Sequence, residues 1–267
     1  MLNLIIFSKD RGCQLDALLR SINKFLRMEA AISVLYTYSN NDYKRAYDDL
    51  IKMYKHINFV KESNFKMNTL DLMDSRREFT LYLVDDIILT KRIEDDRLIR
   101  YFRHDKEVLA IKLVAGKNIQ QRFGENDYIK QPDFTDKHFN VWNWKAIRGT
   151  PQWGYPMGVA TQIYRTNDLR ELLPRLNYAS PNFMESEMDR HPLDKKLMMC
   201  YNTNKLIIIQ INRVQQTHKN NRYGNVSLKE LNDKWLEGFR ISTDPWYNLR
   251  DDAFEFLNVG VEYEPRN

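Results

Sequence analysis

The chain is 267 residues long, which is enough for a substantial core, and its 43% hydrophobic and 12% aromatic residues argue against disorder. The net charge of +5 comes without a basic stripe interleaved with aromatic residues, which argues against a nucleic-acid partner and fits an anionic small ligand or an anionic membrane surface. Cys13 and Cys200 lie far apart in sequence, which argues against a disulfide scaffold and predicts a reducing, cytoplasmic compartment.

The N-terminal part alternates between apolar runs and segments of helical periodicity. Strands are predicted at residues 2–7, 32–36, 57–60 and 79–84, and helices at 15–26, 43–54 and 65–73. The first run lacks a basic region and a cleavage site, so we interpret it as a strand and not as a signal peptide. This alternation predicts an α/β fold with a mostly parallel central sheet flanked by helices.

The second half is more elaborate. Strands are predicted at residues 108–114, 139–147, 160–164 and 206–211, with a polar loop at 116–137. Asn167 is expected to cap a helix, and the last part of the chain predicts two amphipathic helices at 227–239 and 246–257. No segment approaches the roughly 18 apolar residues of a membrane span.

Two adjacent carboxylates, Asp85 and Asp86, interrupt the apolar run LYLVDDIIL. An unpaired buried carboxylate is costly, so the pair is expected where the fourth strand ends, at the edge where α/β sheets bind ligands. Mg²⁺ and Mn²⁺ prefer such oxygen ligands, and a metal there would neutralise charge on a departing diphosphate. The alternative is that an aspartate caps the following turn.

Two polar loops offer further ligand-binding residues. Ser8, Asp10 and Arg11 follow the first strand without a GxGxxG or GxxxxGK[ST] motif, so they are candidates for contacts to a base or ribose, unless Asp10 merely caps the next helix. In NRVQQTHKNNRYG, His218 is a candidate metal ligand and Arg222 suits a diphosphate. The alternative for this second loop is a solvated basic surface.

An aromatic cluster surrounds the Gly-Tyr-Pro turn. Trp153 and Tyr155 are the strongest candidates for a wall that stacks on the faces of acceptor or donor sugars. The alternative is that these aromatic residues belong to the core.

The segments FSKDRGCQLDALLRSI, LVDDI, WGYPMGV, SPNFMESE and NRVQQTHKNNRYG together resemble nucleotide-sugar glycosyltransferases with the GT-A fold. The closest likeness is to family-two-like bacterial enzymes that build surface polysaccharides, and it covers residues 2–240. The resemblance implies one GT-A-like domain over 1–267, with a nucleotide-binding half at 1–115, an acceptor-binding half at 116–240 and a helical tail at 241–267.

The resemblance also implies residue roles. Asp85 and Asp86 stand at the position of the family's DxD motif, although the shorter spacing leaves open which of them touches the metal. Ser8, Asp10 and Arg11 match the loop that contacts the nucleotide.

Further roles come from the same likeness. Tyr38 and Ser39 lie where the family often holds the base, and His218 lies where some members supply a further metal ligand. Glu185 falls at the position of the catalytic base of an inverting enzyme. Glu187 is a second candidate, and only one of the two glutamates can point to the same site from a helix.

The implied activity is metal-dependent transfer of a hexosyl-type sugar from a nucleoside-diphosphate sugar, most often a UDP-sugar, to a glycan or lipid-linked acceptor, with inversion. Mn²⁺ or Mg²⁺ is the expected cofactor. Peripheral contact with the inner face of a membrane is a further expectation, with Trp235, Phe239 and Trp246 as candidate contacts.

A sugar-phosphate nucleotidyltransferase and a non-catalytic nucleotide- or glycan-binding domain remain as alternatives. The enzymatic interpretation requires that Asp85 and Asp86 face a cleft and are not both neutralised by basic residues inside the fold.

Overall fold

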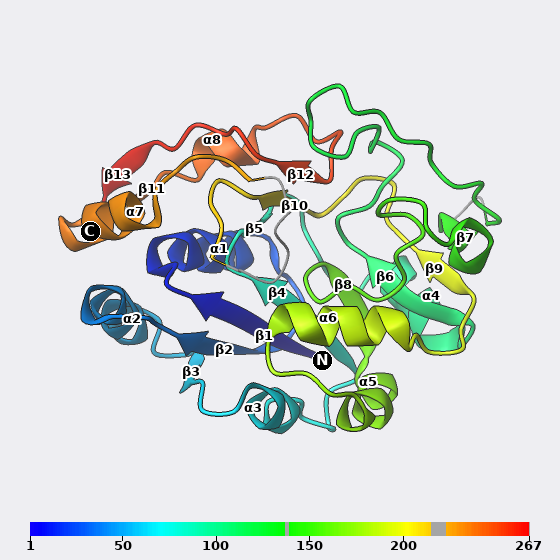
Figure 1. Ribbon diagram of the computed structural model, residues 1–267. Helices are drawn as coiled ribbons and strands as arrows, with labels where there is room; N and C mark the ends of the chain where they lie inside the picture. Colours follow the sequence, from blue (N-terminus) through cyan, green and yellow to red (C-terminus); the bar gives the residue numbers. More distant parts are fainter. Residues whose placement is uncertain (137–138, 215–222, 267) are drawn as a thin grey trace.

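An eight-stranded sheet forms the centre of the computed structural model, which describes residues 1–136, 139–214 and 223–266 (Figure 1). Its strands follow the order β3 (Asn58–Lys61), β2 (Ala30–Thr37), β1 (Leu2–Lys9), β4 (Phe79–Val84), β8 (Gln162–Arg165), β6 (Val108–Lys112), β9 (Leu197–Met199) and β7 (Val141–Asn143).

The strands predicted from the N-terminal part form the parallel half of this sheet. β3, β2, β1 and β4 are parallel neighbours, β8 runs antiparallel to both β4 and β6, β6 and β9 are parallel, and β7 is antiparallel to β9. The α/β prediction with a mostly parallel central sheet is therefore confirmed. Because the carboxyl ends of β1, β2 and β4 meet at one edge, the polar loops that follow them converge there.

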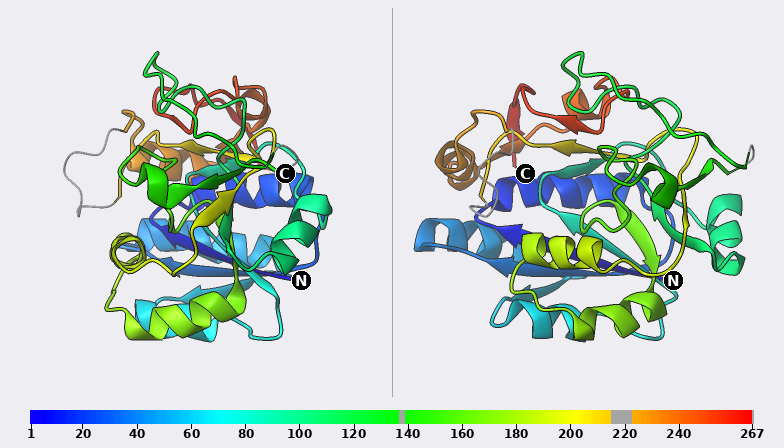
Figure 2. Two further views of the ribbon diagram at one scale, coloured as in Figure 1. Left: turned by 90° about the vertical axis from the view of Figure 1, so that its right-hand side faces the viewer. Right: turned by 45° about the vertical axis from the view of Figure 1, so that its right-hand side comes forward.

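Helices cover both faces of the sheet, with α1 on one side and α3 and α5 on the other in Figures 1 and 2. The helices are α1 (Gly12–Phe25), α2 (Asn41–Met53), α3 (Phe65–Asp71), α4 (Arg97–His104), α5 (Thr166–Leu172), α6 (Pro181–Arg190), α7 (Leu228–Leu236) and α8 (Asp244–Tyr247), with short 3-10 helices η1 (Trp144–Ile147) and η2 (Leu173–Arg175).

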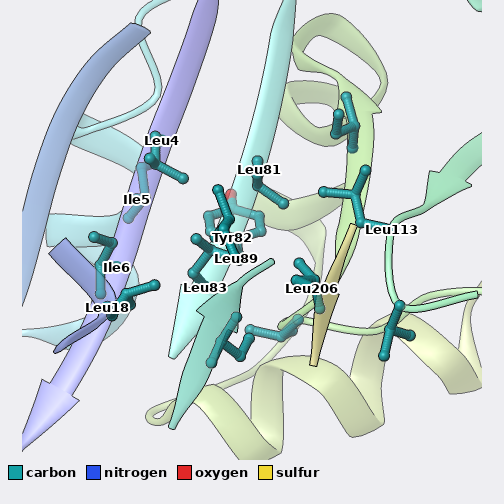
Figure 3. Packing of buried hydrophobic residues seen from close by; sticks show 14 of the residues in the cluster. Leu4, Ile5, Ile6, Leu18, Leu81, Tyr82, Leu83, Leu89, Leu113 and Leu206 are labelled. Carbon is teal, nitrogen blue, oxygen red and sulfur yellow. The ribbon is translucent and has the colours of Figure 1, made fainter. Parts of the chain in front are cut away.

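The core lies between these layers. Leu4 and Ile6 of β1 and Leu81 and Leu83 of β4 are almost wholly buried, and Leu18 of α1 packs with them (Figure 3). Full burial of one such side chain stabilises a fold by roughly 1.5–3 kcal/mol. This apolar layer fixes the positions at which the two strands end.

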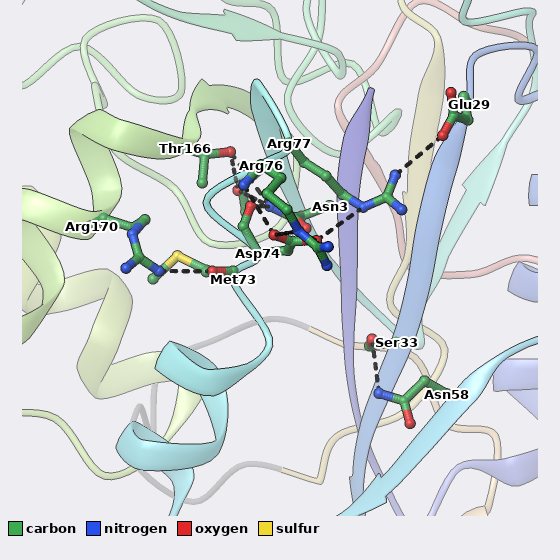
Figure 4. Close-up of polar contacts among 11 residues, drawn as sticks. Asn3, Glu29, Ser33, Asn58, Met73, Asp74, Arg76, Arg77, Thr166 and Arg170 are labelled. Atoms are coloured by element: carbon green, nitrogen blue, oxygen red, sulfur yellow. Dashed lines mark hydrogen bonds and ion pairs between the residues drawn. The ribbon is translucent and has the colours of Figure 1, made fainter.

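A network of polar side chains lies at the amino ends of β1 and β4 (Figure 4). Asn3 donates to the Asp74 carbonyl at 3.0 Å, and the hydroxyls of Thr80 and Thr166 lie 2.9 Å apart. Arg170 donates to the Met73 carbonyl at 2.9 Å. These hydrogen bonds connect the amino ends of β1 and β4 to residues 73–74 and to helix α5.

A second, three-stranded sheet begins where β4 ends. It has the order β12 (Glu255–Phe256), β10 (Leu206–Ile209) and β5 (Ile87–Leu89), and a separate pair is formed by β11 (Phe239–Ile241) and β13 (Tyr263–Pro265). Only Asp85 and Asp86 separate β4 from β5. The chain therefore passes from the large sheet into the small one at the carboxylate pair.

Several predictions about the second half were wrong. The strand predicted at 139–147 is limited to β7, because the Asn143 side chain accepts hydrogen bonds from the next turn and starts η1. The strand predicted at 206–211 is confirmed as β10 (Leu206–Ile209), and it lies in the small sheet. Asn167 does not cap α5, which begins at Thr166 with Arg165 as its N-cap.

The helix predicted at 227–239 is confirmed as α7, but the helix predicted at 246–257 and the helical tail at 241–267 were wrong. The short helix α8 ends at Tyr247, Ala253 then forms a bridge with Gln121, and the chain pairs with β10 as strand β12. Trp235 and Trp246 are buried and cannot contact a membrane, whereas Phe239 is exposed. Within the described residues, no helix has both the length and the apolar character of a bilayer span.

Candidate active site

A cleft of about 1090 Å³ opens at the carboxyl ends of the parallel strands. Its walls come from the ends of β1, β4 and β6, from helix α6, from the loop at 148–161 and from the small sheet. The volume lies at the upper end of the range of small-molecule sites. The predicted location of the ligand site, outside the strand ends, matches this cleft.

Asp85 lines the cleft and fastens the loop after β1. Its carboxylate accepts hydrogen bonds from the Ser8 hydroxyl at 2.8 Å, the Lys9 backbone N–H at 3.1 Å and Arg11 Nη1 at 2.8 Å. Burial raises the pKa of Asp85, and the contacts with Arg11 oppose that rise. Both carboxylate oxygens accept hydrogen bonds, so Asp85 holds the loop after β1, and its role as a metal ligand stays a prediction.

Arg11 joins the two acids. The same Nη1 donates to Asp86 at 2.9 Å, while Nε and Nη2 donate to the side chain and the carbonyl of Asn212 at 2.8 and 2.7 Å. Burial opposes the charge of the guanidinium, but Asp85 and Asp86 outweigh it and raise the pKa of Arg11. One positive charge is thus set against two negative ones.

Asp86 keeps one free oxygen. Its Oδ1 is buried and has no hydrogen-bond partner among the described residues. A buried carboxylate oxygen without a partner is unfavourable unless a cation or donor pairs with it. The enzymatic interpretation required that both acids face a cleft and are not both neutralised. Both acids line the cleft and both contact Arg11, but Asp86 keeps one oxygen without a partner among the described residues.

The other residues predicted for the nucleotide divide into two groups. Ser8 and Arg11 line the cleft, whereas Asp10, Tyr38 and Ser39 are not among its lining residues. Asp10 accepts a hydrogen bond from the Ser39 backbone N–H at 2.7 Å from a left-handed conformation (φ 57°), and it does not cap α1. At this end the cleft is lined instead by Leu35, Thr37 and Glu62.

Glu185 lies on the opposite side of the same cleft. Ser180 caps α6 by accepting a hydrogen bond from the Phe183 N–H, and the helix then presents Glu185 to the cleft, where Oε1 accepts from the Val159 N–H at 3.4 Å. Burial raises the pKa of Glu185 to about 7, and Lys112 opposes the rise. A carboxylate with this pKa is suited to general base catalysis near neutral pH.

Glu187 does not line the cleft. Its carboxylate forms ion pairs with Arg190 and, at 3.8 Å, with His191 on the outer side of α6. Two positions along a helix point about 200° apart, so Glu185 and Glu187 cannot share one site. Of the two glutamates, the structure favours Glu185.

No family model matches the sequence. The bifunctional glycosyltransferase pgtA of Dictyostelium discoideum is 26% identical over 295 residues, which cover 97% of this chain and 38% of the relative. The crystal structure of S. aureus TarS aligns with a TM-score of 0.51 at 12% identity, over 77% of this chain and 36% of TarS.

The chain has a GT-A-like glycosyltransferase fold. The fold that the resemblance implied is thereby confirmed. The chain spans less than two fifths of the length of either relative.

Only one of the two aromatic residues predicted to form a sugar-binding wall lines the cleft. Tyr155 lines the cleft. Trp153 is fully buried, with its ring 5.2 Å from Trp142 and 5.5 Å from Phe254, so its assignment to the acceptor site was wrong. Its edge-to-face contacts are those of a core aromatic cluster.

Three cleft residues escaped the sequence reasoning: Lys112 at the end of β6, Gln152 in the loop before Trp153, and Glu255 on β12. Burial lowers the pKa of Lys112 to about 8 and raises that of Glu255 to about 7. The sequence did contain a signal for two of these residues. Lys112 interrupts an apolar run and Glu255 lies between two phenylalanines, which is the same pattern of a charged residue among apolar ones that marks Asp85 and Asp86 in LYLVDDIIL.

His218 and Arg222 lie outside the described residues, so their predicted roles stay predictions. Among the residues that are described, no group of three or more His, Cys, Asp or Glu side chains is arranged to hold a metal ion.

Proposed function

We propose that the chain is a metal-dependent, inverting glycosyltransferase that moves a sugar from a nucleoside-diphosphate sugar to a glycan or lipid-linked acceptor. The observation that carries this proposal is the presence, in one cleft, of Asp86 with a free buried oxygen and of Glu185 with a pKa of about 7. The likeness to pgtA over nearly the whole chain supports glycosyl transfer.

Asp86 fits a single-carboxylate metal site. Mg²⁺ and Mn²⁺ sites at nucleotides often use one or two carboxylates, with water and phosphate oxygens as the other ligands. The bound cation would neutralise the charge that develops on the leaving diphosphate. Arg11 supports this site, because its Nη1 donates to both Asp85 and Asp86 and so holds the Asp86 side chain in place.

The nucleotide occupies the β1–β2 end of the cleft in this proposal. Ser8, Leu35, Thr37 and Glu62 line that end, beside the strand ends that precede Asp86. UDP is the first candidate nucleotide, since it is the usual one for this fold. The sugar then extends past Asp86 toward Tyr155 and Glu185.

Glu185 acts as the general base. Its carboxylate takes the proton of the acceptor hydroxyl while that oxygen bonds to the anomeric carbon, and the bond from that carbon to the diphosphate breaks on the opposite face. The Val159 N–H holds Oε1 in place, which leaves Oε2 for the proton. Inversion follows from attack opposite to the leaving group.

Arg11 argues against the nucleotidyltransferase alternative. That reaction needs a basic loop after the first strand to bind a triphosphate, but four N–H bonds of the Arg11 guanidinium are already directed to Asp85, Asp86 and Asn212. By resemblance to the family, we also propose that the acceptor is a precursor of a surface polysaccharide and that the protein makes peripheral contact with a membrane.

The test is calorimetric binding of UDP with and without Mn²⁺. Asp86→Ala is expected to lose the manganese-dependent binding while its circular dichroism stays that of the wild type. Asp189→Ala is the matched control, because Asp189 lines the same cleft but pairs with Arg148 at its far side. If Asp86→Ala bound UDP and Mn²⁺ as tightly as the wild type, the metal role would be refuted.

A further inference from the structure

A third acidic side chain reaches the cleft from the small sheet. Ile208 of β10 pairs with Ile87 of β5 on one side and with Glu255 of β12 on the other. Glu255 therefore stands two strand spacings, about 10 Å, from the strand that starts directly after Asp86. The Ile209 N–H donates to the Asp86 carbonyl at 2.7 Å, which ties the small sheet to the metal-site residue.

Glu255 is held in a defined orientation. It is 6% exposed, and its Oε1 accepts a hydrogen bond from Gln152 Nε2 at 2.7 Å. Gln152 has a left-handed backbone (φ 61°), which is uncommon outside glycine, and Lys112 Nζ donates to its carbonyl. Within residues 1–136, 139–214 and 223–266, no hydrogen bond reaches Oε2 of Glu255.

The catalytic steps described above leave this carboxylate without a role, although it is costly to bury. Glu185 supplies the base and Asp86 the metal ligand, and both are close enough to affect the titration of Glu255. Burial raises the pKa of Glu255 to about 7, so near neutral pH the group is able both to accept and to donate hydrogen bonds. Sugar hydroxyls form both kinds of bond.

We propose that Glu255, oriented by Gln152, binds hydroxyls of the transferred sugar and determines which donor sugar the cleft accepts. This inference rests on the proposed function. The order of the strands supports this role of Glu255. The proposed nucleotide end of the cleft lies at β2 and β1, and Asp86 follows the next strand, β4. Lys112 lies at the end of β6, two strands beyond β4. The space between Asp86, Glu185 and Glu255 is therefore that of the sugar.

The charge of the residue favours the same occupant. A carboxylate repels the diphosphate, whereas neutral hydroxyls donate to it without an opposing charge. A site built to bond a particular hydroxyl strongly rejects an analogue that lacks it or presents it elsewhere, because the buried carboxylate is then left unpaired.

The experiment compares affinities for sugars on one nucleotide. Wild type and Glu255→Gln are titrated in the presence of Mn²⁺ with UDP, UDP-glucose, UDP-galactose and UDP-N-acetylglucosamine, and with GDP and GDP-mannose. We expect the wild type to prefer one sugar, and Glu255→Gln to reduce the affinity ratio between that sugar and its competitors about tenfold or more. Its affinity for the free nucleoside diphosphate should change less than twofold.

Two further variants sharpen the result. Glu255→Asp keeps the charge but withdraws the carboxylate by one bond, and it should also lose selectivity. If thermal unfolding shows that Glu255→Gln does not fold, the affinity ratios are measured with Glu255→Asp instead. Glu62→Gln, a half-buried carboxylate at the nucleotide end, is the control, and it should change all affinities by one factor and leave the ratios intact.

The outcomes separate this inference from the proposed function. Unchanged sugar ratios in both Glu255 variants, or an equal loss for sugar nucleotides and free diphosphate, would overturn the role of Glu255 alone. Failure of the wild type to bind any of the sugar nucleotides would overturn the proposed function together with it.

Discussion

Replacing Glu185, the proposed catalytic base, with glutamine should make the protein more stable at high pH. Burial raises the pKa of Glu185 from its ordinary value of 4.5 to about 7. Stability associated with the protonated form is therefore complete below about pH 4.5 and is lost as the pH rises through 7. With about 1.36 kcal/mol for each pKa unit, the raised pKa of Glu185 lowers the stability of the fold by about 3 kcal/mol at pH 8 and by about 1 kcal/mol at pH 5, relative to a carboxyl group that keeps its ordinary pKa.

The assay is urea unfolding of wild type and Glu185→Gln at pH 5 and pH 8. Glutamine has the same shape, stays neutral and still accepts the hydrogen bond from Val159. The stability difference between variant and wild type should grow by about 2 kcal/mol from pH 5 to pH 8.

Glu187→Gln is the control on the same helix, and its carboxylate forms surface ion pairs, so the corresponding change should stay below about 0.5 kcal/mol. An offset for Glu185→Gln that is the same at both pH values would refute the reasoning.

Glu185, Arg11 and Trp153 can each be tested by a further measurement. The transfer rate kcat/KM should fall about tenfold for each pH unit below 7, as Glu185 becomes protonated, and a flat profile between pH 5 and 7 would contradict its role as base. Arg11→Met leaves Asp85 and Asp86 without their shared cation and should lower the free energy of unfolding by about 3–5 kcal/mol in urea titrations, whereas the half-exposed Arg148→Met should cost less than about 1 kcal/mol. Trp153→Ala should lower the free energy of unfolding by about 3–5 kcal/mol in thermal or urea unfolding, and a change below about 1 kcal/mol would show that Trp153 is not part of the packed core.

The parallel half of the sheet was predictable because its strands and helices are local patterns. The apolar runs of β1, β2 and β4 have the length of buried strands, and the polar residues that follow them mark the edge at which the cleft opens. Asp86 and Glu185 were identified for this reason and by resemblance to the family. Their roles in catalysis stay predictions until the binding and rate measurements are made.

The remaining features depend on contacts between distant parts of the chain. The apolar spacing at 246–257 is helical, yet the segment pairs as a strand because β10 offers it an edge. The aromatic residues Trp153 and Tyr155 are two positions apart, and only the packing around Trp142 decides which of them is buried. Arg11 meets Asn212 across 201 residues, which no local pattern encodes.

The two-residue turn between β4 and β5 has a consequence for protein engineering. Because each end of this turn is hydrogen-bonded into a different sheet, an insertion there would shift both acids relative to the cleft. Chimaeras with related chains should therefore keep the segment from β4 to β5 as one uninterrupted piece.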